Sequence, residues 1–89
     1  MFIKPSTRQG KRYMAVFHDG TTIHFGQAGG STYIDHKDKA KRAAYIARHR
    51  VNEDWSNPKT AGALSRYILW EKESLSQAIS GFKSRFNIK

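Results

Sequence analysis

The hydrophobic pattern of this chain changes its period once, at the glycine-rich segment of residues 26–30. Before this segment, apolar residues stand two apart on either side of Asp19-Gly20: Tyr13, Ala15 and Phe17 first, then Ile23 and Phe25. This spacing places the apolar residues on one face of paired strands, and Asp-Gly is a favoured hairpin turn. Phe2-Ile3, ended by Pro5, is a candidate third strand. Residues 2–26 therefore predict a small antiparallel sheet.

After the glycine-rich segment, apolar residues recur at helical spacing, which predicts helices over residues 35–51, 61–70 and 75–86. Good capping residues stand at their starts: Asp35 or Asp38, then Thr60, then Ser74. We expect Ala40, Ala44, Ala47 and Val51 to form the buried stripe of the first helix, which would let it lie close to the sheet. The predicted fold is an α+β single domain over residues 1–89, with an N-terminal β-hairpin or small antiparallel sheet followed by three helices.

Charge points to the class of partner. Lys and Arg number 16 against 7 Asp and Glu, a net charge of +9. The excess positive charges repel one another, and binding to a polyanion would relieve this repulsion. Nucleic acid is the commonest polyanion. The surplus is densest in the first predicted helix, which has almost no acidic residue after Asp38. The candidate nucleic-acid-binding residues are Lys37, Lys39, Lys41, Arg42, Arg48, His49, Arg50 and Arg66.

The leading hypothesis is a basic module that contacts phosphates without strong sequence specificity, with DNA as a more natural partner than RNA. Arg66 stands on the second predicted helix, where it either extends the basic surface or pairs with Glu71. The runs around Arg48 and Arg50 contain no pattern that indicates base-specific readout.

Catalytic and metal chemistry have little support in the residues. The chain has no cysteine, and His18, His24, His36 and His49 follow no zinc-ligand spacing. The acidic residues fall at turns and helix ends, where capping explains them. We therefore expect no enzyme, no catalytic residue, no metal and no cofactor.

The lack of long apolar segments indicates where the protein is located and whether it contacts a membrane. The N-terminus lacks the apolar stretch of a signal peptide, and no segment approaches the ~20 apolar residues of a membrane span. We expect an intracellular protein that is not secreted and does not bind a membrane.

Short motifs occur along the chain in a fixed order: Phe25-Gly26, His36-Lys37-Asp38, Arg48-His49-Arg50, Glu53-Asp54-Trp55 and Ser65-Arg66-Tyr67-Ile68-Leu69-Trp70. In this order they resemble a family of short uncharacterised proteins of large DNA viruses of eukaryotes. The resemblance implies a viral protein, present in an infected host cell or in the virion, and it implies no site residues.

The resemblance also supports a second hypothesis. In it the chain is a small structural virion component, such as a minor capsid or internal packaging protein, that binds an acidic protein surface. That hypothesis predicts Trp55, Trp70 or Tyr33 exposed in an apolar patch.

Overall fold

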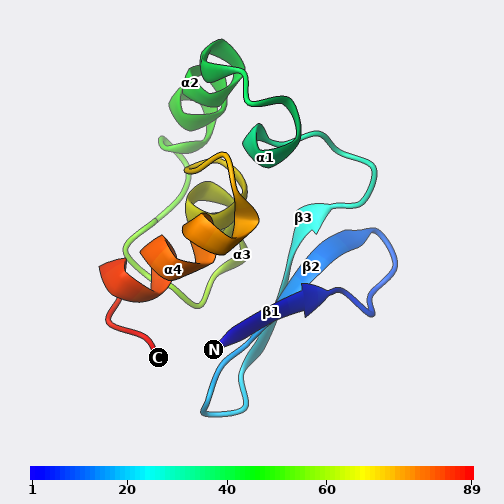
Figure 1. The fold of residues 1–89 in the computed structure, drawn as a ribbon, viewed down its shortest axis with the longest axis vertical. Coiled ribbons are helices and arrows are strands. Elements are labelled where there is room, and N and C mark those ends of the chain that lie inside the picture. The colour runs from blue at the N-terminus through cyan, green and yellow to red at the C-terminus, as the bar shows by residue number, and fades with distance from the viewer.

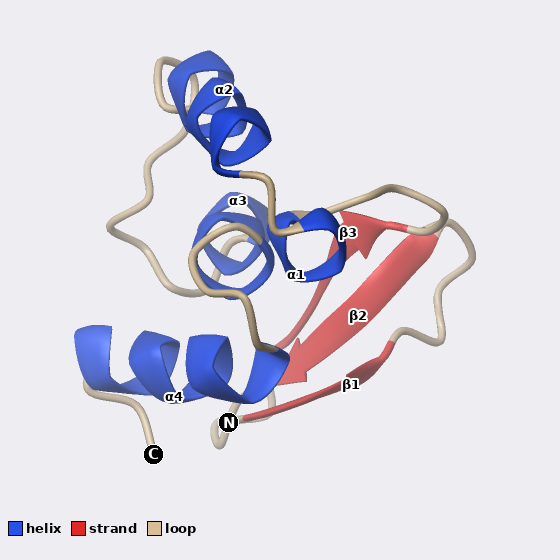
Figure 2. Ribbon diagram, turned by 45° about the horizontal axis from the view of Figure 1, so that its top comes forward, coloured by secondary structure: helices blue, strands red, loops and turns tan.

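The computed structural model describes residues 1–89 as a three-stranded antiparallel sheet followed by helices, which confirms the α+β class (Figure 1). The strands are β1 (Phe2–Pro5), β2 (Lys11–Val16) and β3 (Thr22–Gln27). The helices are α1 (Tyr33–His36), α2 (Lys39–His49), α3 (Ala61–Leu64), the π-helical turn η1 (Ser65–Leu69) that continues α3, and α4 (Leu75–Arg85). Figure 2 shows the helices gathered on one side of the sheet.

The sheet has the strand order β1-β2-β3, so the predicted third strand is confirmed at its edge. Tyr13 pairs with Phe25 and Ala15 with Ile23, which places these residues on the face that the helices cover. The hairpin loop is longer than a two-residue turn. The amide of Gly20 donates to the carbonyl of Phe17 at 3.0 Å, and Gly20 has a φ of 91°. A left-handed glycine closing a three-residue loop suits the twist of the strands.

The core lies between the sheet and the α3–η1–α4 segment. Its fully buried large side chains come from β3, α3, η1 and α4: Phe25, Leu64, Ile68, Leu69 and Phe82. The apolar residues at helical spacing in the second and third predicted helices therefore supply much of this core. Thr60 and Ser74 also act as the predicted caps, because their hydroxyls accept from the amides of Ala63 and Gln77.

The first predicted helix is two helices. Lys37 adopts the left-handed conformation, with a φ of 55°, and ends α1. Asp38 then begins α2, where its carboxylate accepts from the amides of Ala40 and Lys41. Asp35 belongs to α1, in a capping box with Thr32. Of the two predicted N-caps, Asp38 is confirmed for α2, whereas the N-cap of α1 is Thr32, with Asp35 at the third helical position.

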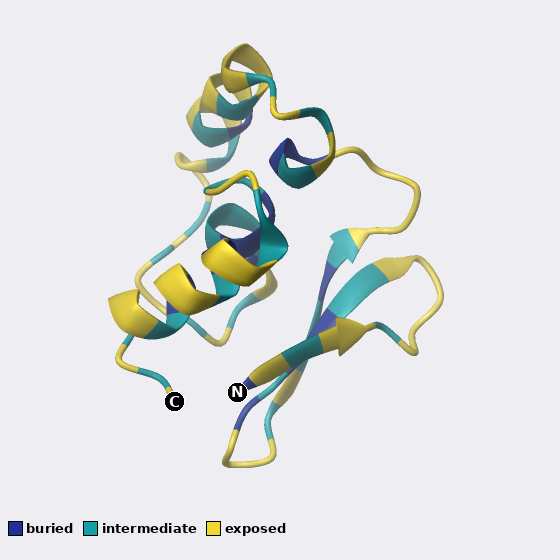
Figure 3. Ribbon diagram, in the orientation of Figure 1, coloured by how far each residue is buried: buried dark blue, intermediate teal, exposed yellow.

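The predicted buried stripe of this helix is wrong. Ala40, Ala44 and Ala47 are exposed, and Val51 keeps 75% of its surface exposed just beyond α2 (Figure 3). The opposite side faces inward instead, because Tyr45 stacks on Trp70 with ring centroids 4.3 Å apart. An alanine buries little apolar area, so an aromatic pair outweighs a row of alanines. α2 consequently packs on α1 and Trp70 and stands away from the sheet.

Gly26 in β3 tests the packing of the sheet against η1. Its φ is 78°, and a Cβ there would lie 2.9 Å from Leu69 Cδ1. We expect Gly26→Ala to lower the free energy of unfolding by about 2 kcal/mol, measured by urea denaturation, because it adds overpacking to backbone strain. Gly29→Ala is the matched control, since its φ is 81° with nothing within 4 Å. Equal destabilisation of the two variants would show that the close approach to Leu69 contributes nothing.

A second prediction concerns the stability of the fold at low pH, where the ion pair between Arg12 and Asp35 is lost. Both Asp35 carboxylate oxygens accept from the Arg12 guanidinium at 2.7 Å, which ties β2 to α1. This hydrogen bond, joined by those from Thr32, holds the pKa of Asp35 well below its usual range. The pair therefore stabilises the fold fully above about pH 4, and the contribution is lost as pH falls below that value. We expect Asp35→Asn to make unfolding free energy less dependent on pH below pH 4; an unchanged profile would contradict this role.

Candidate nucleic-acid interface

The exposed side of α2 carries four cations that form no ion pair: Lys39, Lys41, Arg48 and, at its C-terminal cap, Arg50. We call these residues the outer cations. α2 contains no acidic residue, and Asp38 at its N-cap is engaged by backbone amides. Arg48 also lies in the last turn, where the helix dipole favours positive charge. The positive charge of this surface is therefore not neutralised within the protein.

Helical spacing arranges the outer cations in two rows. Lys41 and Arg48, seven residues apart, share one flank of α2, and Lys39 and Arg50 share the other. Between the rows runs an apolar line that we call the outer strip: Ala40, Ala44, Ala47 and Val51. Along its 11 residues the helix is about 16 Å long.

Two of the predicted binding residues face inward and are engaged in ion pairs. Arg42 donates to Glu71 Oε1 at 2.5 Å and to the Trp70 carbonyl at 2.8 Å. Arg66 donates to the same Glu71 oxygen at 2.9 Å, and its side chain is only 13% exposed. Of the two alternatives for Arg66, the pair with Glu71 is the one observed. These arginines hold helices together, and neither belongs to the outer cations.

The charge of Glu71 is maintained by these partners. Burial raises its pKa, but the hydrogen bonds and charges of Arg66 and Arg42 outweigh burial, so the pKa of Glu71 lies below its usual value. The carboxylate is thus ionised throughout the neutral range. The sequence suggested only the local pair with Arg66, because Arg42 is 29 residues away in the chain.

Two further predicted residues are partly engaged. Lys37 sits at the end of α1 and donates to the carbonyl of Ile34 at 2.9 Å. His49 stacks on Tyr45 at 4.2 Å on the inner side of α2, with Nδ1 3.6 Å from Glu53. Neither residue belongs to the two rows of outer cations.

The aromatic residues of the second hypothesis are not exposed in a patch. Tyr33 is 5% exposed, with its hydroxyl donating to Glu73 at 3.3 Å. Trp70 stacks on the Tyr45 ring, and its centroid lies 5.3 Å from that of the His36 ring. Trp55 donates its indole N–H to Glu53 at 2.7 Å and lies edge-on to Tyr67. The prediction of an exposed aromatic patch is therefore wrong.

Two other classes of feature are absent. No three His, Asp or Glu side chains come together in an arrangement that would hold a metal ion. None of the helices combines the length and the apolar character needed to cross a membrane.

Comparison with known proteins yields one family. The profile of a Family of unknown function (DUF5754) matches residues 2–49, from β1 to the end of α2. The matched part includes Lys39, Lys41 and Arg48. No curated protein and no solved structure matches the chain. The resemblance to viral proteins stays a prediction.

Glu71→Gln tests the arginine pairing. We expect it to lower the free energy of unfolding by about 2 kcal/mol, because two partly buried guanidiniums lose their counter-charge. Urea denaturation measures the change. Glu73→Gln is the matched control, since Glu73 is exposed and accepts one long hydrogen bond; we expect a change within about 0.5 kcal/mol. A Glu71 variant as stable as the control would remove the structural role given to Arg42 and Arg66.

Proposed function

Since the chain belongs to the Family of unknown function (DUF5754), its family supplies no activity, and we propose from its structure a non-enzymatic module that binds nucleic acid through phosphate contacts. The observation that carries this proposal is the set of outer cations, exposed and without acidic partners on α2. Neutralising phosphates with such residues releases counterions, which drives binding without regard to sequence.

The arrangement of α2 suits duplex DNA. The major groove is about 12 Å wide and admits an α-helix. A helix in that groove has one phosphate backbone on each flank, and α2 carries one row of outer cations on each flank. The outer strip between the rows is made of small residues, which permit close approach to the groove floor. A-form RNA has a major groove too deep and narrow for this mode, so DNA is the preferred partner.

Sequence specificity is expected to be weak. Base edges are read mainly by Arg, Asn, Gln and acidic side chains at the centre of the contact. The outer strip has alanines and Val51 there. These residues contribute at most an apolar contact with thymine methyl groups.

A second candidate function is binding of an acidic protein surface, as the virion component of the second hypothesis would require. The observation that favours it is also the outer strip, in which Val51 is 75% exposed. An acidic amphipathic helix would cover the strip and pair with both rows of cations. This candidate predicts that Val51→Ser weakens binding more than removal of one outer cation does.

DNA binding across a salt series tests the leading proposal. We expect the affinity of the protein for labelled duplex DNA to fall steeply with salt. In a variant with Lys39, Lys41, Arg48 and Arg50 changed to Gln, the slope of log K against log salt should flatten by roughly 0.9 for each phosphate that the variant no longer neutralises.

The control variant changes Lys4, Arg8, Lys11 and Lys89 to Gln. These residues are exposed on the sheet, its β1–β2 turn and the C-terminus, away from α2. Both variants lose the same formal charge, so only the position differs. Equal flattening in the two variants would mean that net charge alone attracts DNA. Absence of binding at low salt would refute the proposal and leave the acidic protein surface.

A further inference from the structure

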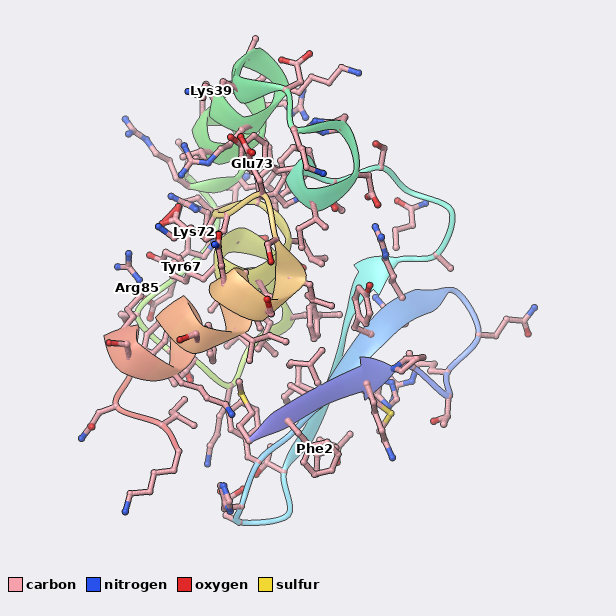
Figure 4. All side chains as sticks on the ribbon, viewed as in Figure 1. Phe2, Lys39, Tyr67, Lys72, Glu73 and Arg85 are labelled. Atoms are coloured by element: carbon pink, nitrogen blue, oxygen red, sulfur yellow. The ribbon has the colours of Figure 1, made fainter.

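A cleft of about 430 Å³ lies between η1 and α4, on a part of the chain that the proposed nucleic-acid interface does not use. Its principal lining residues are Tyr67, Glu71, Lys72, Phe82, Ser84 and Arg85. Figure 4 shows Tyr67, Lys72 and Arg85 together, between α2 and α4. A cleft of this volume accommodates a small organic molecule and exceeds what an inorganic ion needs.

Positive charge exceeds negative charge in this cleft. Glu71 is its one acidic lining residue, and that carboxylate is already hydrogen-bonded to Arg66 and Arg42. Arg85 reaches Glu71 only at 3.7 Å and is half exposed. Lys72 is exposed and forms no ion pair. Lys72 therefore lines the cleft without a carboxylate partner, and Arg85 shares Glu71 with Arg66 and Arg42.

Arg85 is nevertheless held in position. Its guanidinium lies 4.2 Å from the centroid of the Tyr67 ring, which is braced edge-on by Phe86. A guanidinium fixed on an aromatic face keeps its N–H groups directed outward, where they can bind a phosphate in a bidentate manner. If Arg85 gives up its 3.7 Å contact with Glu71 to bind a phosphate, little free energy is lost, because exposed ion pairs are weak.

Each side of the cleft has one unusual feature, a glycine inside the regular α-helix α4 and a π-helical turn in η1. Gly81 lies within α4 and lines the cleft, although a Cβ there would meet nothing within 4 Å and its φ is not positive. Neither packing nor conformation requires this glycine, which weakens the helix interior. A glycine also allows a ligand to approach the backbone closely. The facing segment, η1, is π-helical, a form found frequently at functional sites.

We propose that this cleft is a binding site for a small phosphorylated molecule. Lys72 and Arg85 hold its phosphate, with the Ser84 hydroxyl as a further donor. The organic part lies on the partly exposed ring of Tyr67 and on the backbone of Gly81. Glu71 remains neutralised by Arg66 and Arg42, so it does not repel the phosphate strongly.

An amide NMR titration of the full chain tests the site, with adenosine 5′-monophosphate, inorganic phosphate and adenosine as separate probes. We expect saturable shifts at Lys72, Gly81 and Ser84 with the monophosphate, affinity at least fivefold weaker for inorganic phosphate, and no shifts with adenosine. Equal affinity for the two phosphates would overturn the role of the apolar wall. Absence of saturable shifts in the cleft would overturn the site.

Variants separate this site from general attraction. Lys72→Gln should weaken binding at least fivefold, and Lys72→Gln with Arg85→Gln at least twentyfold. The single variant does not disturb the fold, because the Lys72 side chain has no partner. Lys4→Gln with Arg8→Gln loses the same charge as the double variant and should bind as the unchanged protein does. Equal weakening in both double variants would refute the site.

The variants of the cleft and of the outer cations also distinguish this proposal from the nucleic-acid proposal. The variant without the four outer cations should still bind the monophosphate in the cleft. The variant without Lys72 and Arg85 should keep the salt slope for duplex DNA. Monophosphate shifts confined to α2 would refute the cleft while leaving DNA binding by α2 intact.

Discussion

The arrangement of the helices depends on the ion pairs of Glu71. This single carboxylate gathers Arg42 from α2, Arg66 from η1 and, at longer range, Arg85 from α4. Because Arg42 and Tyr45 point inward together, the rotation of α2 about its axis is determined. The alanines and the outer cations must then face solvent. In this way a structural ion pair inside the protein decides which charges are presented outside.

The distribution of the other acidic residues has a related consequence. Each is engaged by another group of the protein: Asp19 by Lys59, Asp35 by Arg12, Asp38 at the N-cap of α2, Glu53 by Trp55, Asp54 by Ser56, and Glu73 by Tyr33. None remains to neutralise the outer cations. With 16 basic and 7 acidic residues, the surplus has to appear on some surface, and the exposed side of α2 carries the densest share of it. A polyanion would relieve that repulsion.

The local features of the fold could be predicted from the sequence, whereas the orientation of α2 could not. Period-two spacing identified the strand faces around Ala15 and Phe25, and hydroxyl caps identified the starts of α3 and α4. These signals are local, so short windows of sequence contain them. The alanines of α2 have helical spacing too, but spacing alone does not state which side is buried. That side was decided by Trp70 and Glu71, distant in sequence. The same interactions engage Arg42 and Arg66 with Glu71, whereas Lys39, Lys41, Arg48 and Arg50 stay exposed.

The residues on the exposed side of α2 suit contact with the phosphate backbone of DNA better than recognition of a base sequence. Its cations are at the flanks, where long flexible side chains would reach phosphates on either side of a groove in the proposed complex. Its centre, where base readout requires hydrogen-bonding side chains, is a line of alanines ending at Val51. Arg42, which has the fork geometry for guanine, is committed to Glu71 and Trp70 instead. In the proposed complex with DNA, such a helix would gain affinity from charge and fit, and it would have little means to favour one base pair over another.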